Sequence, residues 1–194
     1  FVLRCIENTK NIYHIPKVLY HWRAHVDSTA ENPESKKYAF EAGKRAVQEH
    51  YKRIGMNNVE VSETKYPGIY RSKYKIENSP KVTIILYNTK KDDQLEVCVK
   101  SLKKQSYKNY EIITVKTNGN STNLQKEKNC ASEKAKGEYL LFMEGNCEMI
   151  GKNSLEEMLG ICVRKSTGAV GGKIFYKKKL VEHAGIVTGV DGFY

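Results

Sequence analysis

From residue 81 onward, the chain alternates between short apolar runs and amphipathic stretches. Four runs rich in apolar and β-branched residues predict strands at 81–87, 110–115, 138–143 and 168–176. Three stretches of helical periodicity predict helices at 92–105, 121–136 and 153–165. Strands and helices that alternate through short links are typical of right-handed βαβ units. The pattern therefore predicts an α/β fold built on a mostly parallel sheet flanked by helices.

The first part of the chain has a different pattern. Aromatic and β-branched residues at 17–23 predict a strand. Apolar residues spaced by three and four positions predict a helix at 34–53, with Ser35 as its N-cap and Gly55 beyond its end. This segment is therefore expected to be mainly helical.

Residues 56–80 are polar and include Pro67-Gly68. They predict a connector with one short strand at 69–74. The resulting division is a segment at 1–55, the connector at 56–80 and an α/β domain at 81–194.

Composition suggests which partners the chain could bind. The 194 residues suit one domain, or one domain and a piece of another. The chain opens on Phe1 and ends on Tyr194 in a glycine-rich stretch, and we expect it to be a fragment of a longer protein. Its net charge of +11 favours anionic partners, but a solvated lysine-rich surface explains it equally well. The lysines are scattered rather than interleaved with aromatic residues, which argues against nucleic acid.

The cysteines and hydropathy exclude several classes of protein. The five cysteines are widely spaced and form no Cys-x-x-Cys pair, which argues against a zinc site. Cys98 and Cys162 fall on the apolar faces of predicted helices, which favours a reducing compartment. No apolar run approaches the roughly 18 residues of a membrane span.

The candidate chemistry lies at the end of the third predicted strand. The apolar run 139–143 ends in Glu144-Gly145-Asn146. In open α/β sheets, ligands bind just beyond the carboxyl ends of the strands. This tip is therefore the first place to expect a metal or a phosphate.

Four blocks in the α/β part resemble the family 2 glycosyltransferases, whose fold is GT-A, a Rossmann-like fold of nucleotide-diphospho-sugar transferases. These blocks are 81–86, the SLKKQSYKNYEII stretch at 101–113, Asn129 with 135–142, and 168–176 with 183–189. The last block is similar to the branch that makes bacterial cell-surface polysaccharides. Residues 1–75, with HIPKVLYHWR and YPGIYR, resemble the tail of one such unit leading into the next. The resemblance implies a tandem protein, with 1–55 ending the upstream unit and 81–194 forming a truncated GT-A domain.

The resemblance implies a glycosyltransferase activity. A sugar would pass from a nucleotide-diphosphate sugar to a glycan or lipid-linked acceptor, with Mg²⁺ or Mn²⁺ held against the diphosphate. The implied nucleotide-binding residues are Tyr87, Asn88, Lys116 and Asn129. The implied metal ligands are Glu144 and Asn146, and His183 would lie near the acceptor or the diphosphate. The general base of such enzymes is expected beyond the end of this chain.

The sequence departs from the family at four of these positions. Lys116 falls where the family usually has Asp, and Asn146 takes the place of the last metal-binding Asp. Tyr87-Asn88 stand where Pro-Thr is usual. Two interpretations therefore stay open: an active transferase, or a catalytically degenerate module that binds a nucleotide, a glycan or a partner domain. In the second, Lys116 could supply the positive charge of the metal. A lone His such as His183 is also often structural.

The same resemblance implies a cytoplasmic protein, with peripheral association at the inner face of the membrane as an alternative. The basic run Lys177-Lys178-Lys179 would suit an anionic lipid surface. A truncated sheet exposes apolar surface, so a homodimer is a further expectation.

Overall fold

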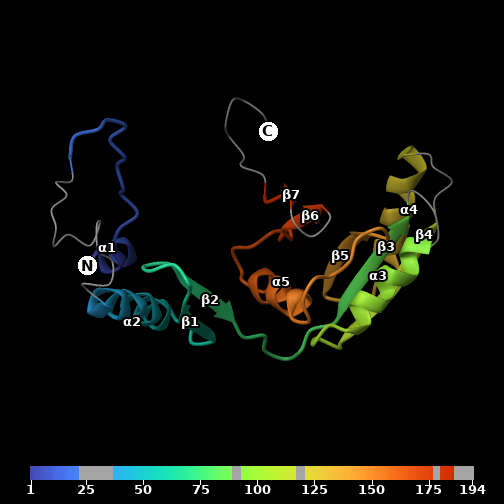
Figure 1. Ribbon diagram of the computed structural model, residues 1–194, viewed down its shortest axis with the longest axis horizontal. Coiled ribbons are helices and arrows are strands. Elements are labelled where there is room, and N and C mark those ends of the chain that lie inside the picture. Colours follow the sequence, from blue (N-terminus) through green and yellow to red (C-terminus); the bar gives the residue numbers. More distant parts are fainter. Residues whose placement is uncertain (22–36, 89–92, 117–120, 177–179, 186–194) are drawn as a thin grey trace. The chain divides into compact units, whose positions relative to one another are not determined.

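The computed structural model describes residues 1–21, 37–88, 93–116, 121–176 and 180–185. The chain divides into two compact units, Phe1–Lys75 and Ile76–Tyr194. Figure 1 colours the first unit blue to green and the second green to red. Among the described residues, no helix combines the length and the apolar character needed to cross a bilayer.

The first unit contains two helices and a hairpin: α1 (Val2–Asn8), α2 (Lys37–Arg53), β1 (Val59–Glu63) and β2 (Tyr70–Tyr74). The two strands pair antiparallel, and Val59 and Val61 of β1 are buried. Gln48 of α2 binds the backbone of β1: its Nε2 donates to the Val59 carbonyl at 2.8 Å, and its Oε1 accepts from the Val61 amide at 2.9 Å. Together with the Tyr70 hydroxyl, which donates to the Phe40 carbonyl of α2 at 2.6 Å, this side chain fixes the hairpin against the helix.

An ion cluster joins α1 to α2. The Glu7 carboxylate accepts two hydrogen bonds from Arg53, at 2.7 and 2.9 Å, and lies 2.6 Å from His50 Nδ1. The hydrogen bond from Arg53, followed by that from His50, lowers the pKa of Glu7 to about 2. Helix α1 has no buried residue, so these polar contacts rather than a hydrophobic face hold it to α2.

The predicted helix at 34–53 is confirmed over Lys37–Arg53. Its proposed cap, Ser35, lies outside the described residues. The helix ends before Gly55, whose φ of +81° is a conformation that glycine adopts without strain.

Two strand predictions in this unit need correction. Residues 17–21 form no strand, and 22–23 lie outside the described part. The segment has strand-forming residues, but no described strand pairs with its backbone. The predicted connector holds two strands instead of one, because the short run Val59–Glu63 completes a hairpin with β2.

The second unit is built on a three-stranded parallel sheet in the order β4-β3-β5. Its strands are β3 (Val82–Asn88), β4 (Tyr110–Lys116) and β5 (Tyr139–Glu144), and helices α3 (Asp93–Lys103), α4 (Ser121–Glu133) and α5 (Ser154–Cys162) follow them in turn. The predicted α/β class with a parallel sheet is confirmed. The arrangement is compatible with a Rossmann-like fold.

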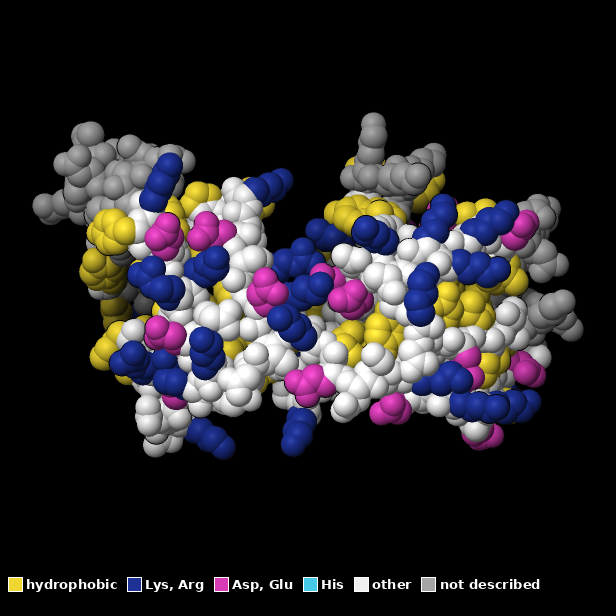
Figure 2. All heavy atoms as spheres, turned by 90° about the horizontal axis from the view of Figure 1, so that it is seen from below, with side chains coloured by type: hydrophobic (Ala, Val, Ile, Leu, Met, Phe, Trp, Pro, Cys, Tyr) yellow, Lys and Arg dark blue, Asp and Glu magenta, His cyan; other side chains and the backbone are white. Residues whose placement is uncertain are grey.

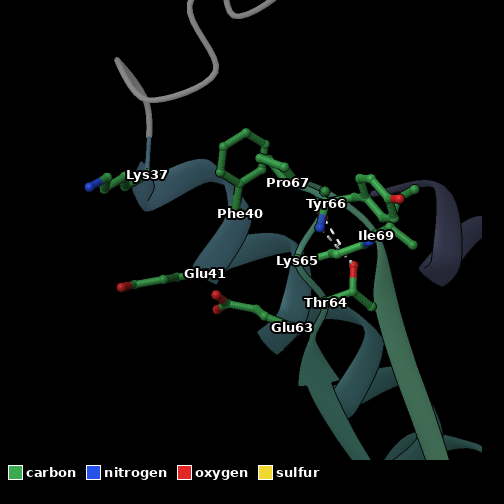
Figure 3. A pocket seen from close by; sticks show the side chains of 10 residues that line it. Lys37, Phe40, Glu41, Glu63, Thr64, Lys65, Tyr66, Pro67 and Ile69 are labelled. Carbon is green, nitrogen blue, oxygen red and sulfur yellow. Dashed lines mark hydrogen bonds between the residues drawn. The ribbon is translucent and has the colours of Figure 1, made fainter.

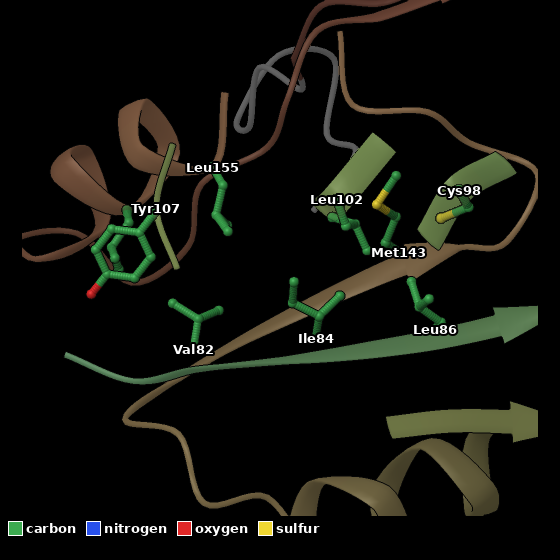
Figure 4. Packing of buried hydrophobic residues seen from close by; sticks show 9 residues of the cluster. Val82, Ile84, Leu86, Cys98, Leu102, Tyr107, Met143 and Leu155 are labelled. Atoms are coloured by element: carbon green, nitrogen blue, oxygen red, sulfur yellow. The ribbon is translucent and has the colours of Figure 1, made fainter. Parts of the chain in front are cut away.

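The central strand β3 is buried on both of its faces, as expected for the middle of a parallel sheet. Its alternate residues Val82, Ile84 and Leu86 contribute to one hydrophobic cluster with residues of α3, α5, β5 and the loop before β4. These residues include Cys98, Leu102, Tyr107, Met143, Leu155 and Leu159. Figure 4 shows these three β3 side chains pointing to the same side. On the opposite face, Ile85 packs with Val115 and with Ala131 of α4.

A polar network closes the amino-terminal edge of the sheet. The Thr83 hydroxyl donates to Glu111 Oε1 at 2.6 Å and accepts from the Gly137 amide at 2.9 Å. Glu111 also accepts from the Lys136 amide at 2.7 Å and pairs with Lys81 at 2.9 Å. These bonds tie the loop that enters β5 to strands β3 and β4. The hydrogen bonds from Thr83 and then Lys136 lower the pKa of Glu111 to about 2.

The fourth predicted strand is wrong in extent and in pairing. Only β6 (Ile174–Tyr176) is a strand within 168–176, and it pairs antiparallel with β7 (Leu180–His183). This hairpin forms a sheet separate from β4-β3-β5. The intervening run 177–179 lies outside the described residues. A local hairpin partner was available, and it replaced the parallel pairing that the alternating pattern suggested.

Charged side chains are mixed on the surface. On the face shown in Figure 2, Lys and Arg are scattered among Asp and Glu over both units.

Replacing Gly137 with Ala should destabilise the second unit. A Cβ at this position would lie 2.4 Å from the Thr83 backbone nitrogen and 2.8 Å from the Lys81 carbonyl oxygen, so the backbone must shift. We expect Gly137→Ala to lower the free energy of unfolding by about 1–3 kcal/mol in chemical denaturation. Gly168→Ala is the control, because nothing lies within 4 Å of a Cβ there. Equal stability of the two variants would contradict this packing.

Glu111 should make stability depend on pH. Its pKa of about 2 in the folded protein lies below its usual 4.5, so its contribution is present above about pH 4.5. The contribution is lost as the pH falls toward 2. The difference in melting temperature between wild type and Glu111→Gln should therefore shrink between pH 6 and pH 3. Glu133→Gln, which removes an exposed carboxylate from the end of α4, is the control for the loss of one negative charge.

Candidate functional site

The carboxyl ends of the three parallel strands bring most of the predicted site residues to one edge. Tyr87 of β3 is in register with Glu144 of β5, and Asn88 is in register with Lys116 of β4. The backbones of all four residues thus lie at adjacent strand ends. The side chains of Asn88 and Lys116 are outside the described part of the structure. Their predicted roles in nucleotide binding stay predictions.

Tyr87 is the best-defined side chain at this edge. It is half-buried on the α4 side of the sheet, beside Ile85 and Val115. Lys128 of α4 places its Nζ 3.5 Å from the centre of the Tyr87 ring, a distance typical of a cation–π contact. Burial, followed by the charges of Glu144 and Cys147, raises the pKa of the Tyr87 hydroxyl. An aromatic face, an ammonium group and a carboxylate therefore lie close together.

The tip of β5 is a tight turn anchored to β3. The Gly145 amide donates to the Tyr87 carbonyl at 2.7 Å, and the Cys147 amide donates back to the Glu144 carbonyl at 3.0 Å. Gly145 is buried, whereas Asn146 is exposed and its Oδ1 accepts from the Cys147 thiol at 3.3 Å. Burial, followed by the negative charges of Glu144 and Glu182, raises the pKa of Cys147.

The donor set of this tip is small for a metal ion. Within the described ranges, no three His, Cys, Asp or Glu side chains gather in a group that could hold one. Glu144 and the amide oxygen of Asn146 offer one charged and one neutral ligand. Mg²⁺ is commonly held by one or two carboxylates together with substrate phosphates and water. The tip therefore offers fewer ligands than a site that holds a metal ion with protein groups alone.

The other two predicted site residues, Asn129 and His183, do not lie at the ends of the parallel strands. Asn129 is exposed on α4, next to Lys128. His183 is half-buried at the end of β7, where it is in register with Ile174. The pairing of β7 with β6 thus places His183 in a different sheet from the one that carries Tyr87 and Glu144.

Lys128 is the site residue that the sequence did not predict. It directly precedes Asn129, which belongs to one of the blocks that resemble the glycosyltransferase family, and this position was a reason to consider it. In a chain with 33 Lys and Arg residues, however, a single lysine on a helix has no distinguishing feature. Only the packing of α4 on β3 shows that it faces the edge of the sheet.

The first unit has a pocket of its own. It has a volume of about 220 Å³ and lies between the start of α2 and the turn that joins β1 to β2. Figure 3 shows its side chains, which include Phe40, Glu41, Glu63, Thr64, Tyr66 and Ile69. None of the predicted site residues lines this pocket.

Two curated proteins are similar to nearly the whole chain. One is an uncharacterized protein, y4gI, of Sinorhizobium fredii, with 32% identity over 98% of this chain and 24% of its own length. The other is the O-antigen biosynthesis protein RfbC of Myxococcus xanthus, with 32% identity over 99% of this chain and 17% of its own length. The chain thus spans a quarter or less of these relatives. No family model matches it, and no solved structure matches it significantly.

Removing the Glu144 charge should make Cys147 more reactive. A negative neighbour disfavours the thiolate, so Glu144→Gln should lower the pKa of Cys147 and raise its alkylation rate severalfold at pH 8. Peptide mapping after timed iodoacetamide labelling measures this rate. Cys5, an exposed cysteine of the first unit, is the internal control. An unchanged Cys147 rate would mean that the two side chains are not close.

Proposed function

We propose that the second unit binds a nucleotide-diphosphate sugar at the carboxyl edge of its parallel sheet. The observation that carries this proposal is the convergence of Tyr87, Lys128 and Glu144 beside the ends of adjacent strands. Ligands of open α/β sheets bind at this edge. The similarity to an O-antigen biosynthesis protein supports a role in the synthesis of bacterial surface polysaccharide. The reaction class is then transfer of the sugar to a glycan or lipid-linked acceptor, as in GT-A glycosyltransferases of family 2.

Each of these side chains has a distinct part in the proposed complex. The Lys128 ammonium is a point charge suited to a phosphate. The Tyr87 ring offers a flat apolar face to the base or the sugar and holds Lys128 nearby. Glu144 accepts hydrogen bonds from sugar hydroxyls, or binds Mg²⁺ or Mn²⁺ together with Asn146. When bound, such an ion would neutralise negative charge on the departing diphosphate.

A second candidate function is binding without transfer. Its supporting observation is the small donor set at the tip, one carboxylate and one amide among the described residues. A degenerate module of this kind would use Lys128, rather than a metal, to compensate the diphosphate charge. It would hold a nucleotide, a glycan or a partner domain beside an active unit elsewhere in a longer protein.

The proposed partners follow from the same chemistry. They are a nucleotide-diphosphate sugar and a glycan or lipid-linked acceptor. We place the protein in the cytoplasm, with peripheral association at the inner face of the membrane as the variant that a lipid-linked acceptor favours. Contact between two copies would cover the exposed β5 side chains Leu140 and Phe142.

Calorimetric titration of UDP-glucose, GDP-mannose and dTDP-glucose, each with and without Mn²⁺, tests both functions. We expect one of the three to bind, and Lys128→Gln to weaken it about tenfold or more, because a hydrogen bond to a charged group contributes about 1.5–3 kcal/mol. Lys126→Gln makes the same charge change at an exposed site on the same helix and should leave the affinity unchanged.

The comparison of binding with and without Mn²⁺ distinguishes the two functions. If Mn²⁺ strengthens binding to the wild-type protein but not to Glu144→Gln, the result supports the transferase. Binding that ignores Mn²⁺ supports the degenerate module. The nucleotide-sugar site itself is refuted if none of the three ligands binds a folded protein, or if Lys128→Gln and Lys126→Gln behave alike.

A further inference from the structure

The chain that leaves the tip of β5 runs along the end of α3, and two buried polar side chains hold it there. Ser101 and Gln105 are 7% and 1% exposed, unusually low values for polar residues. Both belong to the 101–113 block that the sequence singled out. Neither lies at the carboxyl edge, so the ligand chemistry proposed above does not explain their burial.

Ser101 binds the segment three residues beyond Asn146. Its hydroxyl accepts from the Met149 amide at 3.0 Å and donates to the Cys98 carbonyl at 2.7 Å. The hydroxyl thereby links the loop to the backbone of α3. Met149 also packs against the hydrophobic cluster below the loop.

Gln105 binds the same segment at two later points. Its Nε2 donates to the Gly151 carbonyl at 2.8 Å, and its Oε1 accepts from the Leu155 amide at 3.0 Å. Leu155 lies in the first turn of α5, whose amides have no partner within the helix. The neighbouring Ser106 amide adds a bond of 2.6 Å to the Lys152 carbonyl. Gln105 thus caps α5 from a distance and fixes the path that leads to it.

The turn that carries Glu144 and Asn146 is therefore anchored at both of its ends. On one side the Gly145 amide binds the Tyr87 carbonyl, and on the other the Met149 amide binds Ser101. Only the residues 146–148 lie between these anchors. Loss of the second anchor would leave this side of the turn held only by the Cys147 amide bond to Glu144 and by the packing of Cys147 and Met149 on the hydrophobic cluster.

We propose that Ser101 and Gln105 are positioning residues that hold the β5 tip in its place beside Tyr87. They touch no ligand and act through the segment 149–155. The consequence for nucleotide binding rests on the function proposed above, whereas the consequence for the tip does not. The block at 101–113 then has a defined physical role, because it sets the geometry of a site that lies on another strand.

Amide hydrogen exchange by NMR on the 194-residue chain tests the effect on the tip. Ser101→Ala and Gln105→Met each remove one part of the anchor. In both variants the Gly145 and Cys147 amides should exchange about tenfold faster than in wild type. Thr83→Val is the matched control, because it removes a buried hydroxyl from the opposite edge of the same sheet. Wild-type protection of Gly145 and Cys147 in both anchor variants would overturn the proposal.

The affinity for nucleotide sugars is a second measurement, and general destabilisation does not change it while the protein stays folded. At a temperature well below every melting transition, the anchor variants should bind the same three nucleotide sugars about tenfold more weakly. Thr83→Val should keep the wild-type affinity, and Ser101→Thr, which retains the hydroxyl, should restore it. Equal weakening in Thr83→Val would reduce Ser101 and Gln105 to general stabilisers. If wild type binds none of the three, the proposed function fails, and the exchange of Gly145 and Cys147 still decides the role of the anchor.

Discussion

Burial of β3 on both faces is the constraint on which the second unit depends. Ile84, Ile85 and Leu86 have no exposed surface, so every backbone group around them must find a partner within the protein. Strands β4 and β5 provide those partners, and α3, α4 and α5 cover the two faces. Because all three strands run the same way, their carboxyl ends meet at one edge. The place of the candidate site follows from this arrangement.

Polar side chains fix the loops on both sides of β5. At the amino-terminal edge, Thr83 and Glu111 bind the loop that enters β5. At the end of α3, Ser101 and Gln105 bind the loop that leaves β5. Buried polar groups of this kind are costly unless each is satisfied, and a satisfied network selects one geometry among many compact ones. The apolar core holds the layers together, while these two networks fix the loops that enter and leave β5.

The candidate site combines features that favour anion binding with few ligands for a metal. Lys128 and the Tyr87 ring stand on one side, and Glu144 with a neutral amide on the other. A diphosphate carries the negative charge that Lys128 would compensate, and a sugar carries the hydroxyls that a carboxylate accepts from. The chain spans a quarter or less of the relatives it matches.

The sequence by itself determined the class of the second unit, because β-branched runs and helical periodicity report local preference and burial directly. It also located the Glu144-Gly145-Asn146 tip, since a buried strand that ends in polar residues marks a carboxyl edge. Only the tertiary structure decided the pairing of β6 with β7, the hairpin of β1 with β2, and the place of Lys128 over Tyr87. These features depend on contacts between segments far apart in the chain or on a choice between competing partners. A local pattern carries no information about which distant surface a strand or a lysine will meet.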